Sequence, residues 1–448
     1  MMEQTIHKKR DSKTVRAWYM FDWANSVYNL VITTTFFPIY FVGVTGAAYG
    51  EDSVPFLGRT FKNSSLYDYA LATAYLFIAL MLPILSSIAD SYGNKKRFMQ
   101  FFCYLGGLAC IGLFWFKGEQ PSVAWGLGCF MLAAIGYIGS LVFYNSYLPD
   151  IAKPEEHDRI SARGFSFGYL GASLLQIIGF GLVVYFSSKG DKTSGPLFTF
   201  LLVGLWWMGF AQITFFHLPK SLPSIKKPDN NFLTAGFIEL KKVFVHIKAL
   251  KTLKWFLVAF LFYSMGVQTV MLAATLFGQK ALGLPSEKLI ITILLMQFVA
   301  IAGATIISRL SNRFGNLYTL MGVVLLWVVI CITAFFVAVL KESGHEVELY
   351  FYVVAVGVGL VMGGVQALSR STYSKLMPTT RDTASFFSFY DVTEKVSIVV
   401  GIFTFGYIDE LFGMKHSVLA LIVFFVLGFG ALLIAKRKET NANPSVTQ

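Results

Sequence analysis

Long runs of apolar residues alternate with short polar segments along the whole chain. A helix that spans a membrane needs about 20 consecutive, mostly apolar residues, and runs of this length recur throughout. They predict an all-α membrane protein with twelve spans. The predicted spans are residues 17–45, 66–89, 98–117, 122–147, 163–187, 196–217, 253–279, 287–308, 317–340, 349–373, 386–409 and 416–436.

The composition supports lipid as the solvent around these helices. Hydrophobic residues make up 55% of the chain and charged residues 14%, against about 25% charged in an average soluble domain. Basic residues precede the first run, which is too long for the core of a signal peptide and is followed by no small-residue cleavage site. We therefore expect the first span to stay in the protein.

The Lys and Arg residues are distributed unequally between the loops on the two sides of the predicted membrane. The net charge is +12, and most Lys and Arg residues fall on one side of the membrane if both termini are cytoplasmic, which is the positive-inside pattern. This explains the charge without a nucleic-acid partner. We expect a multi-pass protein of the plasma (inner) membrane, with the lipid bilayer as a partner and both termini cytoplasmic.

A short polar sequence motif occurs twice, and its two copies lie about half the chain length apart. "SSIADSYGNKKR" starts at Ser86, and "SRLSNRFGN" starts at Ser308. Asp90 is expected to pair with a basic residue or to cap the next helix, and Gly93 and Gly315 to permit tight turns, so all three are gating candidates. Such a repeat predicts two six-helix halves, the parallel-repeat layout of major facilitator transporters.

The predicted domains are an N-terminal half at residues 1–217, a linker at 218–252 and a C-terminal half at 253–448. "LKKVFVHIKALKTLKW", residues 240–255, predicts a basic amphipathic helix on the anionic cytoplasmic leaflet. A protein-docking helix is the alternative.

Several motifs resemble one family. The carboxylate, glycine and basic cluster of the first polar motif resemble the loop signature of the major facilitator superfamily. "FDWANSVYN" with "FFPIYF", "YLPDIAKPEEHDRISARGFSFGYLG" and "GGVQALSRSTYSKLMP" resemble its vacuole-effluxer-like branch. The resemblance implies the major facilitator fold and a transport function. The branch includes fungal vacuolar proteins that release amino acids after autophagy, and bacterial relatives.

Polar residues line up on several predicted spans. Asp22, Asn25 and Asn29 share one face of the first. A charge at the bilayer centre costs at least about 2.5–3.5 kcal/mol, so such a face is expected to meet partners or a watery cavity. The substrate-binding candidates on all spans are Asp22, Asn25, Asn29, Gln176, Gln268, Gln366, Arg370, Asp391 and Lys395. Glu394 and Asp22 are the candidates for proton coupling.

Each candidate has a structural alternative. The Asn and Gln side chains suit interhelical hydrogen bonds, Asp22 suits a pair with Arg16, and Arg370 suits an extension toward the membrane surface. In the eleventh span, Asp391 and Lys395 have the i, i+4 spacing of an ion pair. That pair would leave Glu394 free to exchange a proton or to meet a cationic group.

No catalytic motif is present in the sequence, and the glycines of "GVGLVMGG" suit close helix packing. We expect no enzyme, cofactor or metal site, and a small molecule as substrate. The sequence predicts a secondary active transporter that moves a small polar solute, with an amino acid as the leading class, through a midplane site between the halves. Protons are the candidate coupling ion. A transporter of an amphipathic or lipid-like molecule and a non-transporting membrane sensor are the alternatives.

Overall fold

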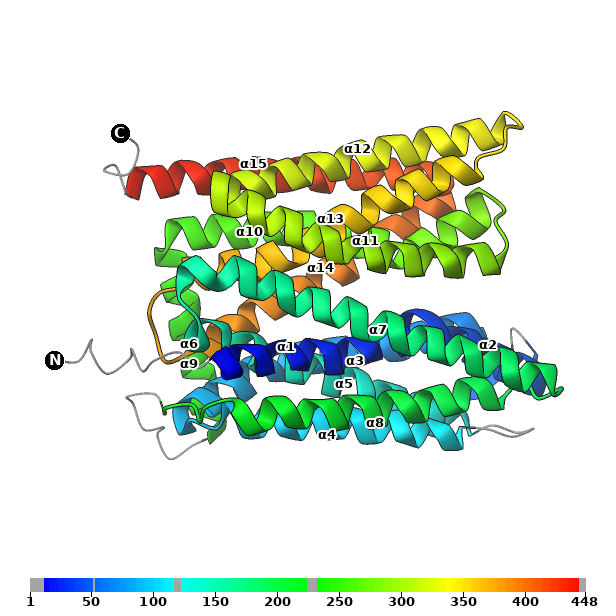
Figure 1. Ribbon diagram of the computed structural model, residues 1–448, viewed down its shortest axis with the longest axis horizontal. Coiled ribbons are helices and arrows are strands. Elements are labelled where there is room, and N and C mark those ends of the chain that lie inside the picture. The colour runs from blue at the N-terminus through cyan, green and yellow to red at the C-terminus, as the bar shows by residue number, and fades with distance from the viewer. Residues whose placement is uncertain (1–11, 51–52, 117–121, 224–231, 443–448) are drawn as a thin grey trace. The chain divides into compact units, whose positions relative to one another are not determined.

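The computed structural model describes residues 12–50, 53–116, 122–223 and 232–442, and these are almost entirely helical (Figure 1). The first part contains α1 (Ser12–Val27), the π-helix η2 (Tyr28–Phe36), α2 (Phe37–Tyr49), β1 (Val54–Phe56), β2 (Arg59–Phe61), α3 (Asn63–Tyr92), α4 (Lys95–Gly112), η3 (Leu113–Trp115), α5 (Val123–Ser146), α6 (Leu148–Ile151), η4 (Pro154–Glu156), α7 (His157–Ser188) and α8 (Ser194–His217). The second part contains α9 (Phe232–Ala249), α10 (Lys251–Leu276), η5 (Phe277–Ala281), α11 (Ser286–Phe314), α12 (Asn316–Glu342), α13 (Glu348–Leu376), α14 (Thr383–Phe412) and α15 (Met414–Ala442).

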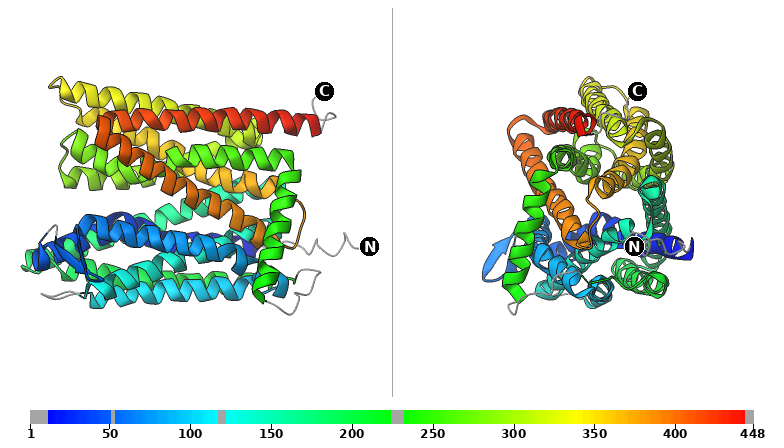
Figure 2. Two further views of the ribbon diagram at one scale, coloured as in Figure 1. Left: turned by 180° about the vertical axis from the view of Figure 1, so that it is seen from behind. Right: turned by 90° about the vertical axis from the view of Figure 1, so that its left-hand side faces the viewer.

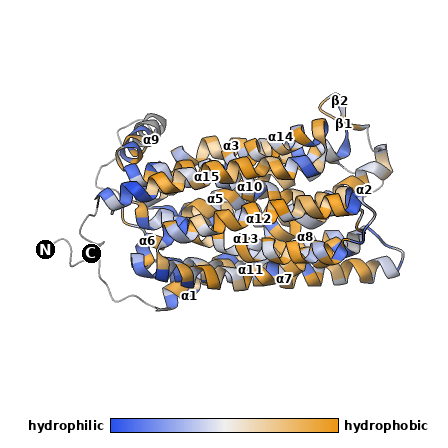
Figure 3. Ribbon diagram, turned by 90° about the horizontal axis from the view of Figure 1, so that it is seen from above, coloured by the Kyte–Doolittle hydropathy of each residue, from blue (hydrophilic) through white to orange (hydrophobic). Residues whose placement is uncertain are grey.

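Every predicted span coincides with a helix. Within the described residues, 11 helices are long and apolar enough to cross a membrane, and apolar residues predominate along them (Figure 3). The remaining predicted span is α14, which has 30 residues and carries three charged residues near its middle. Large apolar side chains such as Phe216 and Phe403 are 82% and 76% exposed, as expected for surfaces that face lipid.

The first span contains a feature that the hydrophobic pattern did not predict, the π-helix η2 of 9 residues. Pro38 follows it and has no N–H to donate to the carbonyl one turn earlier. The Thr34 and Thr35 hydroxyls both donate to the Leu30 carbonyl, at 2.7 and 3.0 Å, and compete with the backbone ladder. These two causes account for the wider turn at this point.

Contacts divide the chain into two compact units. Unit 1 comprises Met1–Ile151, Phe167–Gly236 and Arg381–Ala384, and unit 2 comprises Ala152–Ser166, Phe237–Thr380 and Ser385–Gln448. The start of α7 thus belongs to unit 2, and the start of α14 belongs to unit 1. The domain boundaries at residues 217 and 253 stay a prediction.

Both units use the same helix pairings. In unit 1, α1 packs on α8, α3 on α5, and α4 on both α5 and α8. In unit 2, the helices at the equivalent places pair in the same way: α10 with α15, α11 with α13, and α12 with both α13 and α15. This packing repeats for five helices in each unit, in agreement with the predicted repeat, while α7 and α14 are each divided between the two units.

Glycines set the closest approach in unit 2. A Cβ atom on Gly303 of α11 would lie 1.9 Å from the Leu360 carbonyl oxygen of α13, and one on Gly363 would lie 2.3 Å from that of Ala300. A larger residue at either position would force the two helices apart. The prediction that "GVGLVMGG" serves helix packing is therefore confirmed.

The connection before α10 differs from the prediction. The amphipathic helix expected at residues 240–255 ends earlier, at Ala249, because the chain leaves helical geometry at Leu250 (ψ 88°) and turns sharply from α9 into α10 (Figure 2). Val243 and Ile247 of α9 are buried, whereas Lys241 and Lys242 are exposed. The amphipathic character thus applies to α9.

Candidate functional site

Four predicted residues of unit 2 meet in one cluster, formed by α10 and α14. The Lys395 ammonium lies 2.7 Å from the Glu394 carboxylate and 3.6 Å from that of Asp391. The Gln268 amide of α10 donates to the other oxygen of Glu394 at 2.9 Å. We call Gln268, Asp391, Glu394 and Lys395 the α14 cluster.

The expected ion pair between Asp391 and Lys395 is present, but the expectation that Glu394 is free is wrong. Glu394 accepts hydrogen bonds from Lys395 and Gln268. Asp391 is 3% exposed, and its Oδ2 atom has no hydrogen-bond partner among the described residues. The Glu394 carboxylate lies closer to the Lys395 ammonium than that of Asp391 does, because the glutamate side chain is longer by one methylene group.

Two candidates on α13 are engaged elsewhere. The Arg370 guanidinium donates to the hydroxyl and the carbonyl of Ser161, at 2.9 and 3.0 Å, and lies over the Phe165 ring. These contacts fix the start of α7 against α13 within unit 2, so Arg370 does not extend to the membrane surface. The Gln366 amide donates to the sulfur of Met271 at 3.3 Å.

In unit 1, Asp22 and Asn25 of α1 are both buried. The Tyr144 hydroxyl of α5 donates to Asp22 at 2.7 Å. Both amide atoms of Asn25 are without a hydrogen-bond partner among the described residues. A buried amide left unpaired is costly, which makes Asn25 the stronger ligand candidate on this helix.

The other candidates of unit 1 lie at η2. Gln176 of α7 is fully buried, and its amide donates to the Thr35 hydroxyl at 3.2 Å. Asn29 is half-buried. Gln176 thus makes the interhelical hydrogen bond that was its structural alternative.

The gating candidates of unit 1 lie where α3 ends. Gly93 has φ +65°, and a Cβ there would lie 2.8 Å from backbone atoms of Ser221 and Pro223, so the turn requires glycine. The Asp90 carboxylate accepts a hydrogen bond from the Ala384 N–H at 3.3 Å. It thereby caps the start of α14, whereas the expected alternatives were a pair with a basic residue or a cap on the helix that follows Asp90 in the chain.

Close to Asp90, Lys95 is 3% exposed at its side chain and lies 2.5 Å from Asp150. The same ammonium donates to Thr383 at 2.7 Å. Lys95, Asp150 and Thr383 thus form a polar cluster of unit 1 beside the cap that Asp90 makes.

Unit 2 contains a similar group of hydrogen-bonded polar residues, and its members were not among the site residues predicted from the sequence. Asp158, at the start of α7, has a fully buried side chain and lies 2.6 Å from the Lys375 ammonium. Ser311 and Asn316 each donate to it at 2.8 Å. Gly315, with φ +84°, makes the turn between these two donors. Asp158, Ser311, Asn316 and Lys375 thus form a polar cluster of unit 2.

A signal for this cluster was available in the sequence. Asp158 lies in the quoted motif "YLPDIAKPEEHDRISARGFSFGYLG", and Asn316 matches Asn94 of the repeated polar motif. Hydrophobic periodicity places Asp158 at the edge of a span, where a carboxylate is unremarkable. Only its burial sets it apart.

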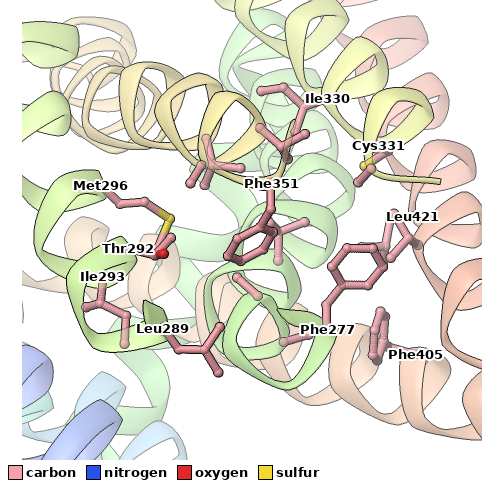
Figure 4. A pocket seen from close by; sticks show the side chains of 18 residues that line it. Phe277, Leu289, Thr292, Ile293, Met296, Ile330, Cys331, Phe351, Phe405 and Leu421 are labelled. Carbon is pink, nitrogen blue, oxygen red and sulfur yellow. The ribbon is translucent and has the colours of Figure 1, made fainter. Parts of the chain in front are cut away.

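An apolar cavity of about 60 Å³ lies inside unit 2 (Figure 4). Thr292 is the polar residue in a lining that is otherwise apolar apart from the thiol of Cys331. None of the sequence-predicted site residues lines it. Among the described residues, no group of three or more His, Cys, Asp or Glu side chains is placed to hold a metal ion.

Comparison with known proteins decides the family. The family described as "Vacuole effluxer Atg22 like" matches residues 10–443. The chain belongs to this family. It is 30% identical over 444 residues to the MFS-type transporter YxiO of Bacillus subtilis (strain 168), with 98% of each chain covered. It is 25% identical to Autophagy-related protein 22 of Saccharomyces cerevisiae (strain YJM789), covering 91% of this chain and 89% of the relative.

Solved structures agree on the fold of this Atg22-like chain. The human organic anion transporter MFSD10 (TETRAN) matches with a TM-score of 0.69 at 12% identity, over 94% of this chain and 99% of that one. The transporter FucP in the outward conformation matches with a TM-score of 0.67 at 13% identity, over 95% and 98%. The chain is an integral, multi-pass transporter of the major facilitator superfamily with a small molecule as substrate, and it is not an enzyme.

Proposed function

We propose that this Atg22-like protein is a secondary active transporter of a small zwitterionic solute, with amino acids as the leading class. The observation that carries the proposal is the α14 cluster, which places both signs of charge within one helical turn. Its Glu394 carboxylate suits the ammonium group of such a solute, and its Lys395 ammonium suits the attraction of the solute's carboxylate toward the cluster. Glu394 is the most accessible charge there, since its side chain is 21% exposed.

The remaining candidates extend the proposal within each unit. In unit 1, Asn25 is the strongest solute ligand because its amide is buried without a partner, and Asp22 and Asn29 lie on the same segment of chain. In unit 2, Gln268 positions Glu394. Gln176, Gln366 and Arg370 support the helices through the contacts described above.

The amphipathic alternative finds less support. Its most suitable space would be the apolar cavity of unit 2, but that cavity has about 60 Å³, against roughly 300–1,000 Å³ for pockets that enclose drug-sized ligands. We therefore favour the polar solute. We also propose proton coupling, which the carboxylates of the α14 cluster support, and a location in the plasma membrane with cytoplasmic termini. The distribution of Lys and Arg supports this orientation of the termini.

Reconstitution in proteoliposomes tests the proposal. A mixture of radiolabelled amino acids should enter liposomes that contain the protein and stay outside protein-free ones. Lys395→Ala should abolish uptake, whereas Lys436→Ala should retain it, because Lys436 pairs with Glu439 in a half-buried i, i+3 bridge outside the cluster. Absence of any protein-dependent flux would favour the sensor alternative.

A ligand screen gives an independent readout. A solute that binds the folded state raises its apparent stability by RT ln(1 + [L]/Kd), so a solute at 100 times its Kd adds about 2.7 kcal/mol. Amino acids should raise the unfolding temperature of the purified protein, and Lys395→Ala should remove the effect. Stabilisation by apolar amphiphiles alone would contradict the proposal.

A further inference from the structure

The α14 cluster holds one ammonium between two carboxylates at unequal distances. Lys395 is 2.7 Å from Glu394 and 3.6 Å from Asp391. Asp391 is the more buried carboxyl, at 3% exposure, and its Oδ2 atom is unpartnered among the described residues. An ionised carboxylate is very costly to bury without a full partner, whereas a neutral carboxylic acid costs much less.

The neighbouring groups do not supply a second cation to Asp391. On its own helix, the nearby titratable groups are Lys395, Glu394 and Tyr390. From α10, Tyr263 faces the cluster and shares a hydrogen bond of 2.7 Å with Ser369 of α13. The Arg370 guanidinium of α13 reaches the vicinity of Tyr390 and is held by Ser161.

We propose that Asp391 carries a proton, and that Lys395 moves from Glu394 to Asp391 when a cationic group of the solute binds Glu394. The O–H bond of Asp391 then breaks, the proton passes to water, and Lys395 keeps its three protons. One positive charge enters the cluster and one leaves it. Asp391, and not Glu394 or Asp22, is thus the group that couples solute to protons.

Charge balance is the physical reason for this exchange. With Asp391 neutral, Glu394 and Lys395 cancel, so the cluster has no net charge. With the solute's ammonium bound to Glu394, its carboxylate held outside the α14 cluster and the proton released, two negative and two positive groups of the cluster cancel again. Both states avoid a net charge in a weakly polar surrounding, whereas binding without proton release would leave a buried positive charge uncompensated. Proton release on solute binding rests on the proposed transport function, but the presence of a proton on Asp391 does not.

Infrared spectra of the purified wild type and of its variants, compared in the absence of any solute, test whether the proton is on Asp391. The wild type should show the carbonyl band of a protonated carboxyl group at neutral pH, and the band should shift when aspartate is labelled with ¹³C at its carboxyl carbon. Asp391→Asn should lose this band. Glu410→Gln, which alters an exposed carboxylate on the same helix, should keep it. A band that persists in Asp391→Asn would overturn the proposal.

Glu394→Gln tests the movement of the lysine. Removing the negative charge from the nearer partner should bring Lys395 to Asp391 and ionise it, so the aspartate band should also vanish in this variant. An unchanged aspartate band in Glu394→Gln would refute the coupling. If Asp391→Asn does not fold, the ¹³C-aspartate band of Glu394→Gln decides the question alone. Proteoliposomes without flux, together with these spectral losses, would refute the proposed function and leave the proton site intact.

Discussion

Replacing Asp158 by Asn is expected to destabilise the protein strongly, although the two side chains have nearly the same shape. The Asp158 carboxylate is fully buried and accepts hydrogen bonds from Lys375, Ser311 and Asn316, at 2.6, 2.8 and 2.8 Å. An asparagine has one accepting oxygen, and its NH₂ group would face a donor. The change thus removes an ion pair and leaves at least one donor without an acceptor.

The magnitude follows from the burial of both partners. Removing one member of a buried ion pair costs about 3–5 kcal/mol. The Lys375 side chain is 23% exposed, so its ammonium keeps part of its hydration, and we expect the lower end, about 3 kcal/mol. Glu156→Gln is the matched control, because its bridge to Arg159 is exposed on both sides and is expected to contribute less than about 1 kcal/mol.

Equilibrium unfolding in mixed detergent micelles, followed by tryptophan fluorescence, measures both values. A double-mutant cycle with Lys375→Met isolates the interaction free energy between Asp158 and Lys375, which should be at least about 0.5 kcal/mol. The reasoning would be refuted if Asp158→Asn and Glu156→Gln lowered the free energy of unfolding by the same amount. A coupling energy of zero would show that the lysine contributes nothing.

Three further predictions concern packing, gating and topology. Gly303→Ala should destabilise the protein by about 1–3 kcal/mol through overpacking, whereas Gly322→Ala, where a Cβ would meet nothing within 4 Å, should change it little; equal melting temperatures would contradict this. Asp90→Asn, which weakens the cap on α14, should slow flux in proteoliposomes with little change in solute affinity, and a large affinity loss at normal turnover would count against a gating role. A cysteine at Leu57, 87% exposed, should react with an impermeant thiol reagent on intact cells and one at Lys220 should not; the reverse result would invert the topology.

The sequence predicted the helices well because lipid imposes a simple rule. A spanning segment must satisfy its own backbone and present apolar side chains, so hydropathy reports it directly. The π-helix η2 escaped this rule, since it arises from Pro38 and two threonine hydroxyls and not from hydropathy. The break at Leu250 also escaped it, because the charged face of α9 continues into the first turn of α10.

The candidate site was predicted in its membership but not in its connections. Charges in the middle of a span stand out, so Asp391, Glu394 and Lys395 were found from sequence alone. Spacing along the helix predicted the pair of Lys395 with Asp391, but it did not predict that Glu394 lies closer to the same ammonium. Asp158 was missed because its partners Ser311, Asn316 and Lys375 lie far away along the chain. A pattern within a short stretch of sequence does not predict such long-range contacts.

The assignment of Ala152–Ser166 to unit 2 has a consequence for the synthesis of the protein. Asp158 is made 153 positions before Ser311 and 217 positions before Lys375. At about 5–20 residues per second, the ribosome needs roughly 10–40 s to supply those partners. Arg381–Ala384, conversely, belongs to unit 1 and is made near the end of translation. Neither unit is complete until late in elongation, so a chain severed between its two predicted halves would need both fragments to finish either unit.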